Sequence, residues 1–296
     1  MRGFAVSLAV VLLFAPTVRA EAPADQPSLD EALAAPAPAP VNYEPVGIPD
    51  YVTVGLGFGV SVLANSLKPR SMQPAALVDF DEAARDVVRL DSLSARYAIR
   101  DASDVTIALM MMGPLLGDAL VTTAWYRRSP AAAFRMAIVD LEAFAITGAL
   151  QGVTNVLVSR ERPYGRTCGA ETPADAHDCT SSVRYRSFFS GHSSFAFTGA
   201  ALMCSQHLRF KLFGGGGAEI ATCAVSFTVA ASTALFRMMG DMHYATDVLT
   251  GAAVGTLVGF LVPAIHERVW GPPTEAPGFR VSLVPTGTGV SLMGVW

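Results

Sequence analysis

The sequence predicts an all-α fold, a membrane-associated bundle of about six core helices. Only 16% of the 296 residues are charged, whereas about 25% are charged in ordinary soluble domains. Apolar segments of helical length follow one another from about residue 50 to residue 268, and short polar stretches separate them. The net charge is −4 and the chain has no basic run, so no nucleic-acid partner is expected.

The first 45 residues are expected to lie outside the bundle. Residues 1–20 are typical of a signal peptide, because one Arg precedes an apolar run from Phe4 to Phe14 and small residues precede Glu21. The run is short for a bilayer span, and an uncleaved anchor is the alternative. Residues 21–45 are rich in Ala and Pro without an apolar period, which predicts a disordered linker.

Residues 46–270 form the predicted helical domain. Tyr51–Leu67 is a marginal span because it is short, and Asp79–Arg100 has the spacing of an amphipathic helix at the surface or the lipid interface. The other apolar segments are Val105–Trp125, Ala131–Val158, Ser193–Leu208, Ile220–Phe236 and Val248–Ile265. Glycines recur every four residues in the last segment, a spacing that predicts close helix packing: Gly251, Gly255 and Gly259.

Polar residues inside these segments are expected to serve the fold. Asp118, Asp140 and Glu142 are predicted to be paired or rim-exposed structural groups, with a role as ligands as the alternative. His207 stands close to two basic residues and is expected to belong to a basic helix end.

The tail, residues 271–296, has a different character from the helical domain. Two runs rich in β-forming residues flank Pro-Thr-Gly-Thr-Gly, which predicts a short C-terminal β-hairpin.

The four cysteines fall into two kinds of environment. Cys168 and Cys179 lie in one polar loop, and a disulfide between them is expected in an exported protein, with free thiols as the alternative. Cys204 and Cys223 lie inside apolar segments and are expected to be small core residues. No Cys/His spacing indicates a zinc site, and neither a metal nor another cofactor is expected.

A polar stretch between the last two apolar segments carries the strongest chemical signal. His243 and Asp247 are four residues apart, so they share a face if the chain is helical from Tyr244 onward. A carboxylate there can fix the imidazole tautomer and stabilise its cation, which makes a histidine a usable nucleophile. Arg237 can bring a guanidinium to the same rim and bind an anion. A polar helix junction without chemistry is the alternative interpretation.

Two further polar stretches also fall at ends of apolar segments. Arg162 precedes Pro163, which is a typical helix stop. Ser190, Gly191 and His192 open the next segment, where a Ser-Gly pair before a helix presents free N–H groups to an anion. The order of the segments allows all three stretches to meet at one end of the bundle.

With these motifs the chain resembles the type 2 phosphatidic acid phosphatase and vanadium haloperoxidase superfamily, in its membrane lipid-phosphatase branch. The family signature is Lys-x6-Arg-Pro, then Pro-Ser-Gly-His, then Ser-Arg-x5-His-x3-Asp. The matching residues have the right internal spacings: Arg162-Pro163, Ser190-Gly191-His192, and Arg237 with His243 and Asp247. Three positions depart from the signature: Asn155 replaces the Lys, Phe189 the Pro and Phe236 the Ser.

The resemblance implies a role for each matched residue. His243 would attack phosphorus, Asp247 would orient it, and His192 would protonate the leaving oxygen. Charge on the phosphoryl oxygens would be stabilised by Arg162, Arg237 and the backbone at Ser190 and Gly191. Asn155 stands where the family has a phosphate-binding Lys, so only a neutral hydrogen bond is expected there.

The resemblance therefore implies a metal-independent phosphatase that hydrolyses a phosphomonoester or diphosphate, through a phosphohistidine, on a lipid held by the membrane. Two alternatives remain: a degenerate member that binds phospholipid head groups without turnover, and a vanadate-dependent haloperoxidase. The signal peptide and the distribution of basic loops predict a cell-envelope membrane protein whose site faces the periplasm, with a soluble periplasmic enzyme as the alternative. The substrate and the oligomeric state are not predicted.

Overall fold

The computed structural model describes residues 46–70, 78–270, 280–286 and 289–295. These residues belong to one of the two units into which the chain divides, Ala39–Trp296. The signal peptide and the linker predicted for residues 1–45 lie outside the described residues.

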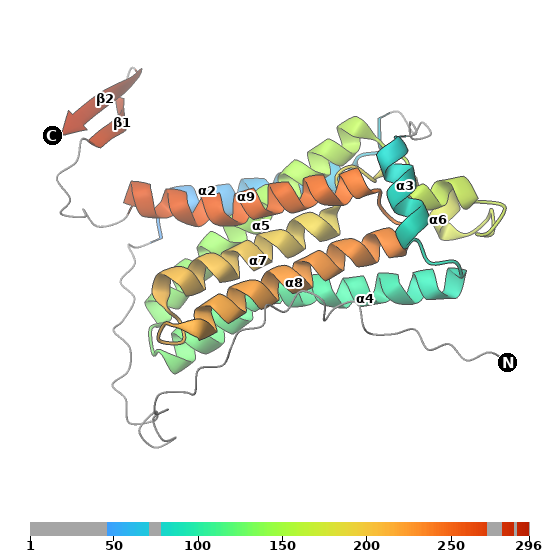
Figure 1. Cartoon of the computed structure of the whole chain (residues 1–296). Coiled ribbons are helices and arrows are strands. Elements are labelled where there is room, and N and C mark those ends of the chain that lie inside the picture. The colour runs from blue at the N-terminus through green and yellow to red at the C-terminus, as the bar shows by residue number, and fades with distance from the viewer. Residues whose placement is uncertain (1–45, 71–77, 271–279, 287–288, 296) are drawn as a thin grey trace, which may run out of the picture. The chain divides into compact units, whose positions relative to one another are not determined.

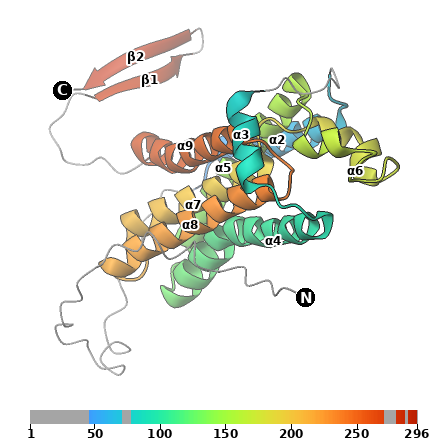
Figure 2. The same cartoon turned by 45° about the vertical axis from the view of Figure 1, so that its right-hand side comes forward.

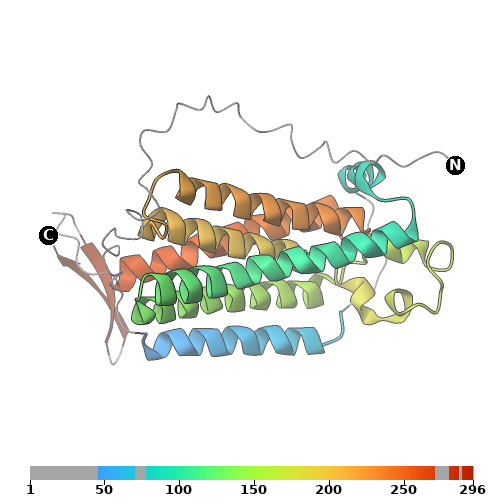
Figure 3. The same ribbon diagram turned by 90° about the horizontal axis from the view of Figure 1, so that it is seen from below.

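The described domain is helical, as predicted, and its long helices run alongside one another (Figures 1 and 3). The long elements are α2 (Ile48–Ser66), α4 (Leu93–Met112) with its π-helical continuation η2 (Gly113–Tyr126), α5 (Pro130–Val158), α7 (Gly191–Phe210), α8 (Gly217–Met239) and α9 (Ala245–Trp270). The short ones are α3 (Asp79–Val88), η3 (Pro163–Thr167), α6 (His177–Thr180) and η4 (Ser182–Tyr185). In the tail, β1 (Arg280–Thr286) pairs antiparallel with β2 (Gly289–Val295).

The single helix expected over Asp79–Arg100 is wrong, because the chain breaks into α3 and α4 there. Ser92 lies just before α4 and its hydroxyl accepts a hydrogen bond from the Ala95 N–H at 3.2 Å, so it caps a new helix. Helix α3 packs against α8 and α9 and crosses the end of the bundle (Figure 2). The break therefore brings α3 to the end where the signature motifs lie.

Helix α7 is the centre of the bundle, packed against α4, α5, α8 and α9. The predicted close packing of the glycine stripe is confirmed, because a Cβ on Gly255 would lie 2.1 Å from the Ser194 carbonyl oxygen. A second close approach joins α7 to α4, where a Cβ on Gly199 would lie 1.9 Å from the Met110 carbonyl oxygen. Main chain therefore touches main chain on two sides of α7, and its position is fixed.

Four segments are long and apolar enough to cross a membrane: Leu93–Tyr126, Pro130–Val158, Gly217–Met239 and Ala245–His266. Among the described helices, α7 is not one of these, although the sequence predicted a span there. Other helices surround α7 and cover polar residues such as Thr198 and Gln206. A helix covered by protein does not need an apolar surface toward lipid.

Both cysteine pairs form disulfides. Cys168 is bonded to Cys179. Cys204 is bonded to Cys223, with their Cα atoms 4.3 Å apart, so the expectation that they are separate core residues is wrong. They pair because α7 and α8 pack side by side.

Candidate active site

The three signature stretches meet at the end of the bundle where α7 and α9 begin and α5 and α8 end. His243 lies in the loop between α8 and α9, and Asp247 lies in the first turn of α9. Because α9 begins only at Ala245, the two residues are not both on the helix. Their closest atoms, His243 Nδ1 and Asp247 Oδ2, are 3.7 Å apart.

The His243 tautomer is fixed by main chain. His243 Nδ1 lies 2.8 Å from the Ser187 carbonyl oxygen, and a carbonyl can only accept, so Nδ1 carries the proton. The lone pair therefore belongs to Nε2. The motif indicated Asp247 for this role, and the carbonyl of Ser187 is a further group that the motif did not reveal.

Asp247 is itself held from three directions. Its Oδ1 accepts from Arg160 at 2.6 Å, and its Oδ2 accepts from the Ser187 hydroxyl at 2.5 Å and the Tyr244 N–H at 2.9 Å. Arg160 also binds Asp81 of α3 at 2.7 Å. Helix α3 is thus linked through one guanidinium to the carboxylate beside His243.

The environment of His243 favours the neutral ring. Its side chain is buried, and burial lowers its pKa to about 3. The Asp247 carboxylate raises this pKa, whereas Arg162 and Arg237 lower it further. At neutral pH the imidazole is therefore uncharged and its Nε2 lone pair is available as a nucleophile.

The guanidinium groups of Arg162 and Arg237 lack close carboxylate partners. Arg162 donates from Nε to the Arg186 carbonyl at 3.3 Å, and among the described residues no carboxylate lies within 4.0 Å of its guanidinium. Burial and the neighbouring Arg100 lower the pKa of Arg162.

Arg237 lies in the last turn of α8 and is buried. Its Nη1 donates to the Ser103 hydroxyl at 2.9 Å and reaches Asp104 Oδ1 only at 3.5 Å. Its Nε is buried and has no partner among the described residues. A buried guanidinium with an unused donor is costly unless it binds an anion, so Arg162 and Arg237 form a candidate anion site.

The first turn of α7 lies at the same end. Ser190 is the N-cap, and its hydroxyl accepts from the Ser193 N–H at 3.3 Å. A Cβ on Gly191 would come within 3.2 Å of Gln151, so α7 starts in close contact with α5. The N–H groups in the first turn of a helix have no intrahelical acceptor and suit an anion.

His192 faces helix α4. Its Nε2 lies 2.7 Å from Asp104 Oδ1, a residue that no motif identified because it stands between two predicted segments. Burial and Arg237 lower the pKa of His192 to about 4, whereas Asp104 raises it.

Asn155 is buried in α5, and its amide contacts main chain. Its Nδ2 donates to the carbonyl oxygens of Gln151 at 3.0 Å and Phe189 at 3.3 Å, while its Oδ1 has no partner among the described residues. The structure therefore shows Asn155 holding the chain just before Ser190.

Ionisable groups at the other end of the bundle are paired with one another. His207 lies in the basic last turn of α7, as expected, but it is also buried between Asp118 at 3.1 Å and Glu219 at 2.5 Å, which the sequence did not indicate. The prediction that Asp118 is a paired structural group is confirmed. Asp140 is likewise paired, as predicted, by accepting from Gln206 at 2.6 Å.

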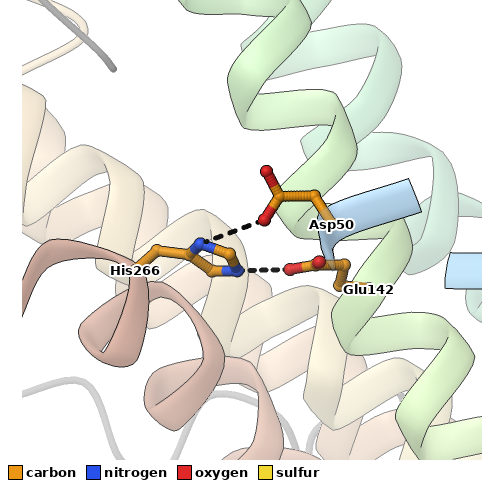
Figure 4. A group of neighbouring side chains, drawn as sticks. All are labelled: Asp50, Glu142 and His266. Carbon is orange, nitrogen blue, oxygen red and sulfur yellow. Dashed lines mark hydrogen bonds and ion pairs between the residues drawn. The ribbon is translucent and has the colours of Figure 1, made fainter. Parts of the chain in front are cut away.

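A second ionic cluster at that end has the geometry of a metal-ligand set. His266 lies between Asp50 and Glu142 (Figure 4), and one ligand atom from each lies within 4.8 Å of the others. Arg135 already enters this cluster, because its guanidinium is 2.5 Å from Asp50 Oδ2 and 2.6 Å from His266 Nδ1. It supplies the positive charge that a metal ion would bring, so we interpret the cluster as a structural ion-pair network that contains Glu142, as predicted.

Residues 138–270 match the PAP2 superfamily. A lipid A 1-phosphatase of Porphyromonas gingivalis is 38% identical over 88 residues, which are 30% of this chain and 18% of that protein. Lipid phosphate phosphatase 1 of Arabidopsis thaliana is 34% identical over 98 residues, which are 30% of this chain and 30% of that protein. The chain thus spans less than a third of either curated relative.

Among solved structures, the chain is similar to a transmembrane PAP2-type phosphatidylglycerolphosphate phosphatase from Bacillus subtilis. The TM-score is 0.48 at 19% identity, and the alignment covers 74% of this chain and 98% of that one.

Proposed function

We propose that this chain, whose residues 138–270 match the PAP2 superfamily, is a metal-independent phosphatase of that family that acts on a lipid phosphate through a phosphohistidine. One observation carries the proposal: a neutral, buried His243 with a free Nε2 lone pair lies beside two arginines that lack close carboxylate partners. A nucleophile next to unpaired cations fits an electrophile that is itself an anion, as a phosphate ester is.

The reaction proceeds in two steps. His243 Nε2 attacks phosphorus, an N–P bond forms, and the P–O bond to the lipid breaks while His192 gives a proton to the leaving oxygen. Water then attacks phosphorus, His192 takes its proton, and the N–P bond breaks to release phosphate. Arg162, Arg237 and the N–H groups at the start of α7 stabilise the equatorial oxygens, whose charge develops in both steps.

Asp247 serves the intermediate rather than the resting ring. Attack through Nε2 makes the imidazole cationic, and a carboxylate 3.7 Å from Nδ1 stabilises that charge. Arg160, Ser187 and the Tyr244 N–H hold the carboxylate in place.

A lipid substrate is supported by two observations. Four segments are long and apolar enough to cross a membrane, so a substrate can keep its tail in lipid while its phosphate reaches the helix ends. The matched relatives are named as phosphatases of lipid A and of lipid phosphates. Phosphatidic acid, phosphatidylglycerophosphate, polyprenyl diphosphate and lipid A form the panel to test.

We place the site on the periplasmic side of an exported envelope protein. The Cys168–Cys179 disulfide lies in the loop between Arg162 and Ser190, which supports exposure of this loop to an oxidising compartment. Mass spectrometry of non-reduced peptides from exported protein tests this, and free thiols at both positions would contradict it.

The central test assays detergent-purified protein against the lipid panel with His243→Ala, Asp247→Asn and His177→Ala. His243→Ala should abolish turnover, and Asp247→Asn should leave a residual rate because the nucleophile remains. His177 is exposed, so its variant controls for loss of a histidine as such. Rapid quench should trap acid-labile phosphate on the wild type only, EDTA should have no effect, and orthovanadate should inhibit.

The outcomes separate the alternatives. An active His243→Ala enzyme, or activity that EDTA removes and Mg²⁺ restores, contradicts the proposed mechanism. Phosphate or vanadate binding without turnover of any ester identifies a degenerate binding protein, the reading that Asn155 in place of Lys favours.

A further inference from the structure

We propose that Asp104 of α4 is a positioning residue for His192: it accepts a hydrogen bond from Nε2–H and thereby leaves Nδ1 as the nitrogen that exchanges a proton with the leaving group. This inference rests on the proposed function. It adds to the site a helix that none of the signature motifs includes.

The geometry of α4 supports a fixed partnership. Asp104 Oδ1 lies 2.7 Å from His192 Nε2, within the range of a charge-assisted hydrogen bond. Helix α4 is itself anchored to the loop before His243, since Arg100 donates from Nε to the Gly240 carbonyl at 2.7 Å. A Cβ on Gly240 would lie 2.8 Å from the Arg100 side chain. The carboxylate is therefore held at a set distance from the site.

The charges around His192 show why it needs this carboxylate. Arg237 of α8 and Arg162 of the loop after α5 both oppose a positive charge on the ring. His243, in the loop before α9, is neutral. Asp104 is the carboxylate within ion-pair distance of His192 in the described part of the chain. A general acid must hold a proton before it gives one, and among the described residues Asp104 is the group that favours the protonated ring, with the substrate phosphate adding to its effect.

Asp104 does not close the anion site. Its distance to Arg237 Nη1 is 3.5 Å, and Arg237 Nε remains without a partner. The Asp104 side chain is 61% exposed, so it lies at the accessible edge of the site. These features identify it as the partner of His192 and distinguish it from an internal anion that competes with phosphate.

The two ring nitrogens of His192 have separate roles, and the protons balance in both steps. In the first step the Nδ1 proton of the His192 cation moves to the leaving oxygen as the P–O bond breaks, and Nε2–H stays with Asp104. In the second step Nδ1 takes a proton from the attacking water. No proton passes to Asp104.

The test compares Asp104→Asn with Asp104→Glu and with Asp101→Asn, a matched loss of charge at an exposed position on the same helix. Asp104→Asn should lower kcat on the order of 10- to 100-fold, part of the 10²–10⁴ that general acid–base catalysis contributes, with KM nearly unchanged. Because Asp104 favours the protonated ring, its loss should move the alkaline limb of kcat to lower pH by about 1 pH unit. Asp104→Glu should recover part of the rate, and Asp101→Asn should match the wild type.

Two results would overturn the inference. One is an unchanged kcat and pH profile in Asp104→Asn, and the other is a lower KM with unchanged kcat, which would identify Asp104 as a competitor of phosphate. A readout without turnover keeps the test separate from the proposed function. In ¹⁵N-histidine NMR, the His192 signal, assigned with His192→Gln, should titrate at lower pH in Asp104→Asn than in wild type or Asp101→Asn, and an equal pKa in all three would refute the contact.

Discussion

Two buried arginines at the site end differ in their partners from the buried cations at the opposite end of the bundle. At the end where α7 begins, Arg162 and Arg237 have donors without close carboxylate partners. At the end where α7 finishes, about 30 Å away by the rise of a 20-residue helix, Arg135 and His207 each meet carboxylates at hydrogen-bond distance. Buried arginines therefore occur in this fold both with and without a close carboxylate partner.

This difference separates binding from structure. A buried charge without a partner destabilises the fold, so its presence indicates a ligand that supplies the partner. A buried charge with its partners in place can be part of the fold alone, and removing one partner leaves the other uncompensated. Composition does not distinguish these two situations, whereas the contacts of each charged group do.

The sharpest way to break this comparison is to truncate one arginine at each end. Arg162→Ala should lower kcat/KM on the order of 10²- to 10³-fold, as loss of one charge-stabilising donor does, with the melting temperature unchanged or raised. Arg135→Ala should lower the free energy of unfolding by about 3–5 kcal/mol, because buried Asp50 loses its guanidinium partner, while the folded fraction keeps near-normal activity. Assays and thermal unfolding in one detergent measure both.

An inversion of that pattern would remove the distinction between the ends. If Arg162→Ala is strongly destabilised and Arg135→Ala is inactive but stable, the unpaired cations are structural. Vanadate supplies a further control, since it should stabilise wild type and Arg135→Ala against heat and should not stabilise Arg162→Ala.

A smaller effect should appear in the pH dependence of stability. The pKa of His243 is about 3 in the folded protein and about 6.5 in an unfolded chain. Between these values the unfolded state binds the proton and the folded state does not. Stability is therefore lost as pH falls below 6.5, by up to about 1.4 kcal/mol per pH unit. His243→Ala should lose less stability than wild type between pH 7 and pH 5, and His177→Ala should behave as wild type.

The smallest expected effect concerns the charge missing at Asn155. Arg160 and Arg166, the two nearby cations that could replace a Lys, are paired with Asp247 and Glu82. Asn155→Lys should therefore raise kcat/KM several-fold, because a charged hydrogen bond exceeds a neutral one by about 1 kcal/mol. Asn155→Met, similar in length but uncharged, is the control. Equal loss of activity in both variants would assign Asn155 to holding the Phe189 carbonyl.

The helical fold and the meeting of the three motifs could be predicted from the sequence, because both depend on local pattern. Apolar period predicts helices, and a motif at a helix end predicts a shared rim. The contacts of Ser187, Asp104 and Arg160 could not be predicted, because they join segments far apart in the chain and no spacing encodes them. The pairing of His207 could not be predicted either, because it depends on three helices whose relative rotation the sequence does not show.

The glycine stripe on α9 has a consequence for substrate choice. A Cβ on Gly251 would lie 2.6 Å from the Ser190 carbonyl oxygen, one residue from the start of α7. His192 lies in α7, and His243 lies just before α9. Main-chain contact therefore fixes the distance between the nucleophile and the acid of the proposed reaction, as binding of one tetrahedral phosphoryl group between them requires. Selection among phosphate esters then depends on the exposed rim, where side chains can change while the distance between the two histidines stays the same.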